Sequence, residues 1–200
     1  PRHRPGIAVV VAAGLLGFVA VLLFVSMQRP EDPAPRPVDA RPGAGEREPA
    51  AGVVPPEWET YEDPAAGYRI AYPPGWSVEV VDETRTDFVD PGTGAYLRVD
   101  WTPSPGDDPV AAWEAQSDSF ASRYADYREI RIDETTFQGR PAAEWEFTYS
   151  DGGAALHAID LGLVTDSRGY ALNLQTPAED WEESQDLWEA FKESFVPAGG

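Results

Sequence analysis

The sequence predicts an α+β fold: an antiparallel β-sheet flanked by two amphipathic helices, preceded by one transmembrane helix and a disordered proline-rich stalk. Three observations predict this layout. Residues 6–25 are uniformly apolar, residues 28–57 hold eight prolines and no aromatic residue, and all seven tryptophans follow residue 57. Beyond that point, short alternating segments are interrupted by two segments with helical spacing. Two amphipathic helices need a sheet to cover, which favours a layered α+β arrangement.

The apolar run GIAVVVAAGLLGFVAVLLFV carries no charge. At 1.5 Å per residue it would extend about 30 Å, the thickness of a bilayer's hydrocarbon core. We expect a transmembrane helix over residues 6–27 and a cytoplasmic flank over 1–5, where Arg2 and Arg4 precede the apolar run. A cleaved signal peptide is the rival interpretation, but no small-residue cleavage site follows the run.

Residues 28–57 are expected to be a linker. Their prolines and mixed charges cannot bury enough surface to fold, and proline-rich chain extends at up to about 3.1 Å per residue.

Within the preceding helix, Ala13 and Gly17 form a small-xxx-small pair that would allow a homodimer. Such pairs are also common by chance, and a chance occurrence is the favoured interpretation of this one. The expected partner of the N-terminal segment is therefore the membrane.

The net charge belongs to residues 58–200. Of 35 acidic and 15 basic residues, 6 of each lie in residues 1–57, so 29 acidic and 9 basic residues remain and supply the whole charge of −20. Phosphate binding is led by lysine and arginine, and Lys192 is the only lysine, so nucleic acid is excluded as a partner. Because cysteine is absent, disulfides, thiolate zinc sites and cysteine nucleophiles are excluded as well.

The first elements of the 58–200 domain are short strands. Residues 67–76, GYRIAYPPGW, predict a strand that ends at a Pro-Pro-Gly turn. Strands over 77–81 and 86–89 follow, and residues 95–102 alternate, which predicts one buried face. The apolar positions of that strand are Leu97, Val99 and Trp101, and the opposite positions are Tyr96, Arg98 and Asp100.

A helix is expected next. Asp107 or Asp108 can cap it, with Pro109 at its first position. One helical face then follows at spacings of four, three and four residues. Its members are Trp113, Ser117, Phe120 and Tyr124.

A run of strands and a last helix complete the domain. We expect strands over 127–134, 142–149, 155–164 and 170–174, the last closing an antiparallel meander. In the first of them Ile130 and Ile132 should share a face; in the second, Trp145, Phe147 and Tyr149 should do so. The helix is expected over about 178–195. Its apolar face is Trp181, Ser184, Trp188, Phe191 and Phe195.

These segments, in this order, resemble a known family. They read GYRIAYPPGW, AYLRVDWTPSPGDDPVAAW, YREIRID, GRPAAEWEFTY, LHAIDLG and GYALNLQTPAEDW. Over residues 67–196 they are similar to the C-terminal extracytoplasmic domain of actinobacterial transmembrane Ser/Thr protein kinases and related membrane-anchored proteins. The resemblance implies a PsbP-like fold, with helices on both faces of a central antiparallel sheet. It also implies that kinase residues would lie upstream of Pro1, because no G-x-G-x-x-G, H-R-D or D-F-G motif occurs here.

The sequence gives little support for catalysis by histidine or serine, or for a metal site built from histidines. His3 flanks the apolar run, and His157 lies on an expected strand among apolar residues, where a packing role is favoured over a base. No second histidine accompanies it for a two-histidine metal site. No G-x-S-x-G motif is present for serine catalysis.

Acidic residues leave two options open. Two strand carboxylates facing each other at about 5–9 Å could hydrolyse a glycan, and loop carboxylates could hold a weak calcium site, although no EF-hand spacing occurs. Because the domain holds so many acidic residues, some of them will lie close together by chance, and this weakens both options. The strand candidates are Asp100, Glu144, Glu146 and Asp160, and the loop candidates are Asp87, Asp90, Asp107 and Asp108.

We therefore expect a cell-membrane, single-pass, non-enzymatic sensor or interaction domain without cofactor or metal, facing the outside. Its partner would be an extracellular ligand or protein, and it would form the tail of a receptor-like Ser/Thr kinase. A free-standing anchored assembly domain is the alternative, and a carboxylate-based cell-wall glycan hydrolase is the third. No residue stands out from the sequence as a ligand-binding site.

Overall fold

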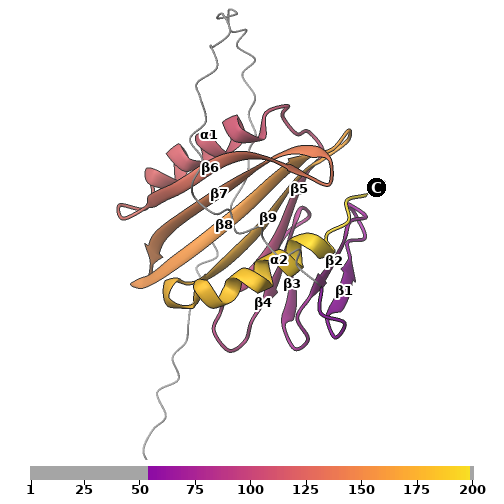
Figure 1. Ribbon diagram of the computed structural model, residues 1–200, viewed down its shortest axis with the longest axis horizontal. Helices are drawn as coiled ribbons and strands as arrows, with labels where there is room; N and C mark the ends of the chain where they lie inside the picture. Colours follow the sequence, from indigo (N-terminus) through magenta and orange to yellow (C-terminus); the bar gives the residue numbers. More distant parts are fainter. Residues whose placement is uncertain (1–53, 199–200) are drawn as a thin grey trace, which may run out of the picture.

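A computed structural model describes residues 54–198, which form a seven-stranded antiparallel sheet with helices on both faces (Figure 1). This confirms the α+β class. In spatial order the strands are β3 (Ser77–Val80), β4 (Arg85–Val89), β5 (Tyr96–Thr102), β9 (Gly169–Pro177), β8 (Ala154–Val164), β7 (Arg140–Asp151) and β6 (Arg128–Phe137).

Two meanders meet at the centre of this sheet. Strands β6 to β9 follow one another through hairpins, as expected, but β9 also pairs along its other edge with β5. The strand expected to close the meander does so, and its pairing with β5 also places it inside the sheet. In the β5–β9 register Arg98 is opposite Asn173, and in the β8–β9 register Asp160 is opposite the same Asn173.

Helix α1 (Pro109–Ala121) covers one face, packing on β6, β7 and β8. Of the two candidate caps, Asp108 is the one that caps: its carboxylate accepts the Ala111 N–H at 3.0 Å, and Pro109 opens the helix. The apolar face of α1 packs on aromatic residues of β7. The buried members of this cluster are Phe120, Trp145, Phe147, Tyr149 and Ala158.

Helix α2 (Gln185–Ser194) covers the opposite face together with a two-stranded hairpin, β1 (Glu59–Glu62) and β2 (Arg69–Tyr72). The larger hydrophobic cluster lies here. From α2 and its flanks it takes the expected aromatic residues Trp181, Trp188, Phe191 and Phe195.

The continuous helix expected over 178–195 is wrong at its start. Two 3₁₀ turns, η1 (Ala178–Asp180) and η2 (Glu182–Ser184), precede α2. The Ser184 hydroxyl donates to the Asp180 carbonyl at 2.8 Å, while the Ser184 N–H donates to Trp181 at 3.0 Å. The side chain thus takes the carbonyl that an α-helix would offer to the backbone, and this turn tightens.

The expected pairing of Ile130 with Ile132 on one face is also wrong. The β6–β7 register shifts between Glu129 and Arg131, which marks a β-bulge. The extra residue turns Ile130 outward, where it is 51% exposed, whereas Ile132 packs against the cluster beneath α1.

The C-terminal end of the described chain is joined to β2. Arg69 and Val196 exchange two backbone hydrogen bonds of 2.9 and 2.8 Å, and the Ala71 N–H donates to the Ser194 hydroxyl at 3.0 Å. No described helix is long and apolar enough to cross a membrane. The expected transmembrane helix (6–27), the linker (28–57) apart from its last residues, and the Ala13–Gly17 pair lie outside the described residues.

Candidate ligand groove

A groove opens beside α1, where the helix stops covering the sheet. Its floor is formed by β5, β9 and β8, and α1 forms one wall. The groove is small, with a cavity volume of about 70 Å³, below the roughly 300–1,000 Å³ of a typical drug-sized ligand site. Its lining residues are Tyr96, Arg98, Asp100, Trp113, Gln116, Phe120, Trp145, Phe147, Tyr149, Asp160, Ala171, Asn173 and Gln175.

Strand parity explains why the floor is polar. Leu97 and Val99 of β5 point into the larger cluster around α2, so the residues between them face the α1 side. Cross-strand pairing then aligns Arg98 with Asn173 and Tyr96 with Gln175. The helix leaves these positions uncovered, and they become the floor.

Two ion pairs fix the charged side chains at the β4–β5 side of this face. Arg98 binds Asp87 through two hydrogen bonds of 2.6 and 2.7 Å. The Arg85 guanidinium binds Asp100 at 2.8 Å. Burial raises the pKa of the Asp100 carboxyl, and the Arg85 charge opposes that rise.

The aromatic hydroxyl and indole donors of the groove are also engaged. Tyr96 donates to the Gln175 side-chain oxygen at 3.0 Å, and Tyr149 donates to the same oxygen. The Trp113 indole N–H donates to the Ala143 carbonyl at 3.0 Å, and the Trp145 indole N–H donates to the Tyr127 hydroxyl. Burial raises the pKa of Tyr96 to about 12, so its hydroxyl stays protonated.

Asp160 and Asn173 differ from their neighbours. Asp160 is 8% exposed and forms no ion pair within residues 54–198. Burial raises its pKa to about 7, and the Asn173 amide beside it and the more distant Arg98 offset part of that rise. Asn173 is 9% exposed; its amide donates to the Ile159 carbonyl, and its Oδ1 is buried without a hydrogen-bond partner. An unpaired acid and an orphan acceptor thus share the floor.

The groove wall depends on Gly162. A Cβ built on this residue would lie 2.8 Å from Trp113 Nε1, closer than real atoms pack. Glycine therefore lets the indole of Trp113 approach β8 closely and donate to the carbonyl of Ala143 on β7, the residue paired with Gly162.

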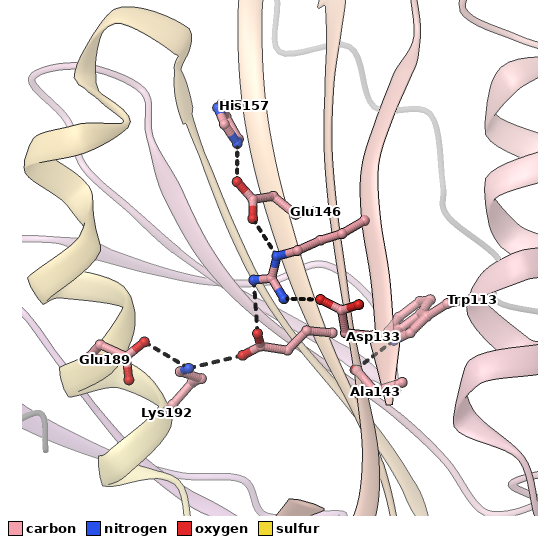
Figure 2. Close-up of polar contacts among 9 residues, drawn as sticks. Trp113, Asp133, Ala143, Glu146, His157, Glu189 and Lys192 are labelled. Atoms are coloured by element: carbon pink, nitrogen blue, oxygen red, sulfur yellow. Dashed lines mark hydrogen bonds and ion pairs between the residues drawn. The ribbon is translucent and has the colours of Figure 1, made fainter. Parts of the chain in front are cut away.

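The other two strand carboxylates lie on the opposite face, where Figure 2 shows Glu146 beside His157 and Glu144 binds Lys192 of α2. Glu144 and Glu146 bind the Arg131 guanidinium at 3.0 and 2.8 Å, and Lys192 of α2 binds Glu144 at 3.0 Å. His157 completes this network through Glu146 at 2.9 Å. These four carboxylate candidates are therefore divided, with Asp100 and Asp160 in the groove and the glutamates under α2.

His157 packs as expected. Its ring stacks on Trp181 with centroids 3.6 Å apart and planes 8° from parallel. Burial lowers its pKa, and the hydrogen bond to Glu146 opposes that effect.

Three of the four acids expected in loops have local roles, and one of them, Asp87, lies within β4 rather than in a loop. Asp87 pairs with Arg98, Asp108 caps α1, and Asp90 accepts the Gly92 N–H at 2.8 Å and the Thr93 hydroxyl at 2.8 Å within its own turn. In the described part of the chain, no three histidine or acidic side chains gather as a metal site would require.

The sequence did not single out Asn173 or Gln175. Each is a polar residue inside a largely apolar strand, GYALNLQTP, and a polar residue at such a position was the only sign that it could have a functional role. Only the strand order, however, brings them beside Arg98 and Asp160.

Comparison with solved structures places the fold among PsbP-like proteins. Cyanobacterial PsbP (CyanoP) from Synechocystis matches with a TM-score of 0.56 and 19% identity, over 76% of this chain and 99% of that one. LpqN of Mycobacterium tuberculosis, described as involved in cell envelope biogenesis, matches with a TM-score of 0.51 and 14% identity, over 70% and 92%. A protein of unknown function from Pseudomonas aeruginosa matches with a TM-score of 0.50 and 16% identity, over 72% and 99%.

At these low sequence identities, the structural matches show a shared fold alone. A search of curated proteins found no match. The family of serine/threonine kinase C-terminal domains matches residues 59–197, which is nearly the whole described region and confirms the resemblance drawn from the sequence. The chain belongs to the serine/threonine kinase C-terminal domain family.

Proposed function

We propose that this chain is the membrane-anchored, extracytoplasmic ligand- or partner-binding tail of a receptor-like Ser/Thr protein kinase. The observation that carries the proposal is the family match over residues 59–197. The apolar run of 6–25 and the proline-rich segment of 28–57 support the tethered arrangement. The domain itself would bind rather than catalyse.

The groove beside α1 is the binding site in this proposal. It is the place where polar groups converge beside aromatic walls, the usual composition of a small-molecule site. Ligand occupancy would change how the tethered domains associate outside the membrane, and the helices would carry that change inward.

The assembly-domain alternative predicts a flat surface without a pocket, and the groove disfavours it. The glycan-hydrolase alternative needs two free carboxyls in one cleft. Asp100 and Asp160 do line one groove, but Asp100 is bound to Arg85 at 2.8 Å, and one free carboxyl remains. Binding is therefore favoured over hydrolysis.

Topology is tested by reporter fusions after Gly200 in bacterial cells. Alkaline phosphatase, which is active only outside the cytoplasm, should be active, and green fluorescent protein exported by the same route should stay dark. A control with Leu15→Arg and Leu16→Arg, which breaks the apolar run, should reverse both signals. A fluorescent, phosphatase-inactive fusion of the unaltered chain would refute the proposed localisation.

The kinase link is tested on the gene. We expect the reading frame upstream of Pro1 to encode a kinase domain with its catalytic and metal-binding aspartates. A start codon directly before Pro1 would instead support the free-standing anchored domain.

A further inference from the structure

The groove offers acceptors and lacks a counter-charge. Its aromatic hydroxyl and indole donors, those of Tyr96, Tyr149, Trp113 and Trp145, are spent on protein acceptors. Of the acidic groups in the lining, the Asp160 carboxyl has no ion-pair partner, and the buried Oδ1 of Asn173 nearby has no hydrogen-bond partner; the amides of Gln116 and Gln175 also line the groove. A ligand that pairs with the ionised Asp160 must donate hydrogen bonds to it.

Charge complementarity narrows the ligand further. Arg98 is neutralised by Asp87, and Asp100 by Arg85. Asp160 is then the one charged lining group without an ion-pair partner among the described residues, which leaves the groove a net charge of −1 when it is ionised. A buried carboxylate is costly unless a cation pairs with it, so a cationic ligand would supply what the protein does not.

The walls suit such a ligand as well. Trp113 and Tyr149 line the groove near this floor, and the faces of aromatic rings attract ammonium groups. The cavity of about 70 Å³ has room for a small group such as an ammonium and the carbons next to it.

We propose that the groove binds an alkylammonium group, with Asp160 as its counter-ion and Trp113 as one wall. This deepens the proposed function and rests on it only for the identity of the site. The amine could belong to a free small molecule or to a lysine side chain of a peptide, since both present the same chemistry.

Binding would displace a proton. Near neutral pH the Asp160 carboxyl is partly protonated, because burial raises its pKa to about 7. The ammonium group favours the ionised form, so the proton leaves as the amine enters. Apparent affinity should therefore rise about tenfold between pH 6 and pH 8, the change in ionised fraction for a carboxyl whose pKa is about 7.

The test uses the chain from residue 54 onward, because every member of both hydrophobic clusters lies between Trp58 and Phe195. n-Butylammonium chloride is titrated against the amide NMR spectrum, with n-butanol as the neutral isostere. We expect saturable shifts at Asp160, Asn173 and Gln175 with the amine and none with the alcohol. N-acetyl-lysine amide and its norleucine analogue, titrated in parallel, show whether a lysine side chain reaches the same site.

Two variants sharpen the result. Asp160→Asn keeps the shape and removes the charge, and should weaken butylammonium binding at least tenfold. Glu114→Gln makes the same charge change at an exposed position of α1 and should leave binding unchanged. Equal shifts from the amine and the alcohol, or unchanged butylammonium binding in Asp160→Asn, would overturn the proposal. Because neither readout depends on the membrane, failure here is distinct from failure of the topology test.

Discussion

Replacing Gly162 with alanine should disturb the groove wall and the stability of the domain together. The new Cβ would lie 2.8 Å from Trp113 Nε1 and 3.0 Å from two further ring atoms. Trp113 cannot yield freely, because its indole N–H is bound to the Ala143 carbonyl at 3.0 Å. The substitution must therefore move the indole off β8 or push the strand away.

The cost follows from three contributions. Overpacking a well-filled site costs about 1–3 kcal/mol, and losing the indole hydrogen bond costs about 0.5–1.5 kcal/mol. Alanine recovers about 0.4–1 kcal/mol by restricting the unfolded chain. The net loss should be about 2 kcal/mol, a large share of a domain stability that is typically about 5–15 kcal/mol.

Urea unfolding of the chain from residue 54 measures this loss. With a slope of about 2 kcal/mol per molar urea, the midpoint should fall by about 1 M. The decisive comparison is the same substitution in a Trp113→Leu background, where the indole is gone. There Gly162→Ala should be neutral or stabilising, which gives a coupling free energy of about 2 kcal/mol. An equal cost in both backgrounds, or no cost in the unaltered chain, would refute the reasoning.

Three further predictions concern the ionised groups. Burial lowers the pKa of His157 below its ordinary 6.5, so its contribution to stability is complete above pH 6.5 and is lost as the pH falls through the folded-state value; His157→Gln should shrink the drop in urea midpoint between pH 7 and pH 5, and an unchanged drop would contradict this. Arg85→Met strands the carboxylate of Asp100 and should cost about 3 kcal/mol at pH 7 by urea unfolding, most of which Asp100→Asn in the same chain should restore. Lys192→Met removes one of two cations on Glu144 and should cost only about 1 kcal/mol by the same measurement; a much larger loss would mean that Arg131 alone does not stabilise the Glu144 carboxylate.

Much of the fold was predictable because its signals are local. The strand 95–102 alternates cleanly, and β5 occupies 96–102; Asp108 and Pro109 mark the start of α1. These patterns depend on neighbouring residues alone. Where a single residue interrupts the period, prediction fails: the bulge at Ile130 leaves no mark in the sequence, and Ser184 tightens the turns before α2 through its own hydroxyl.

The groove could not be predicted for a different reason. Its floor comes from three strands, and the polar residues Arg98, Asn173 and Asp160 lie side by side only because β9 inserts between β5 and β8. Nothing local in the sequence sets that order. The same limit explains why Glu144 and Asp160, similar strand acids in sequence, occupy opposite faces.

The bridge between Arg69 and Val196 has a consequence for synthesis of the chain. The cluster beneath α1 needs residues 113–158 and can close while translation continues. The cluster beneath α2 includes Phe195, and β2 gains its bonds from Ser194 and Val196. That half of the domain cannot be completed until Phe195 and Val196 have been synthesised, so during translation its apolar residues stay exposed longer than those of the cluster beneath α1.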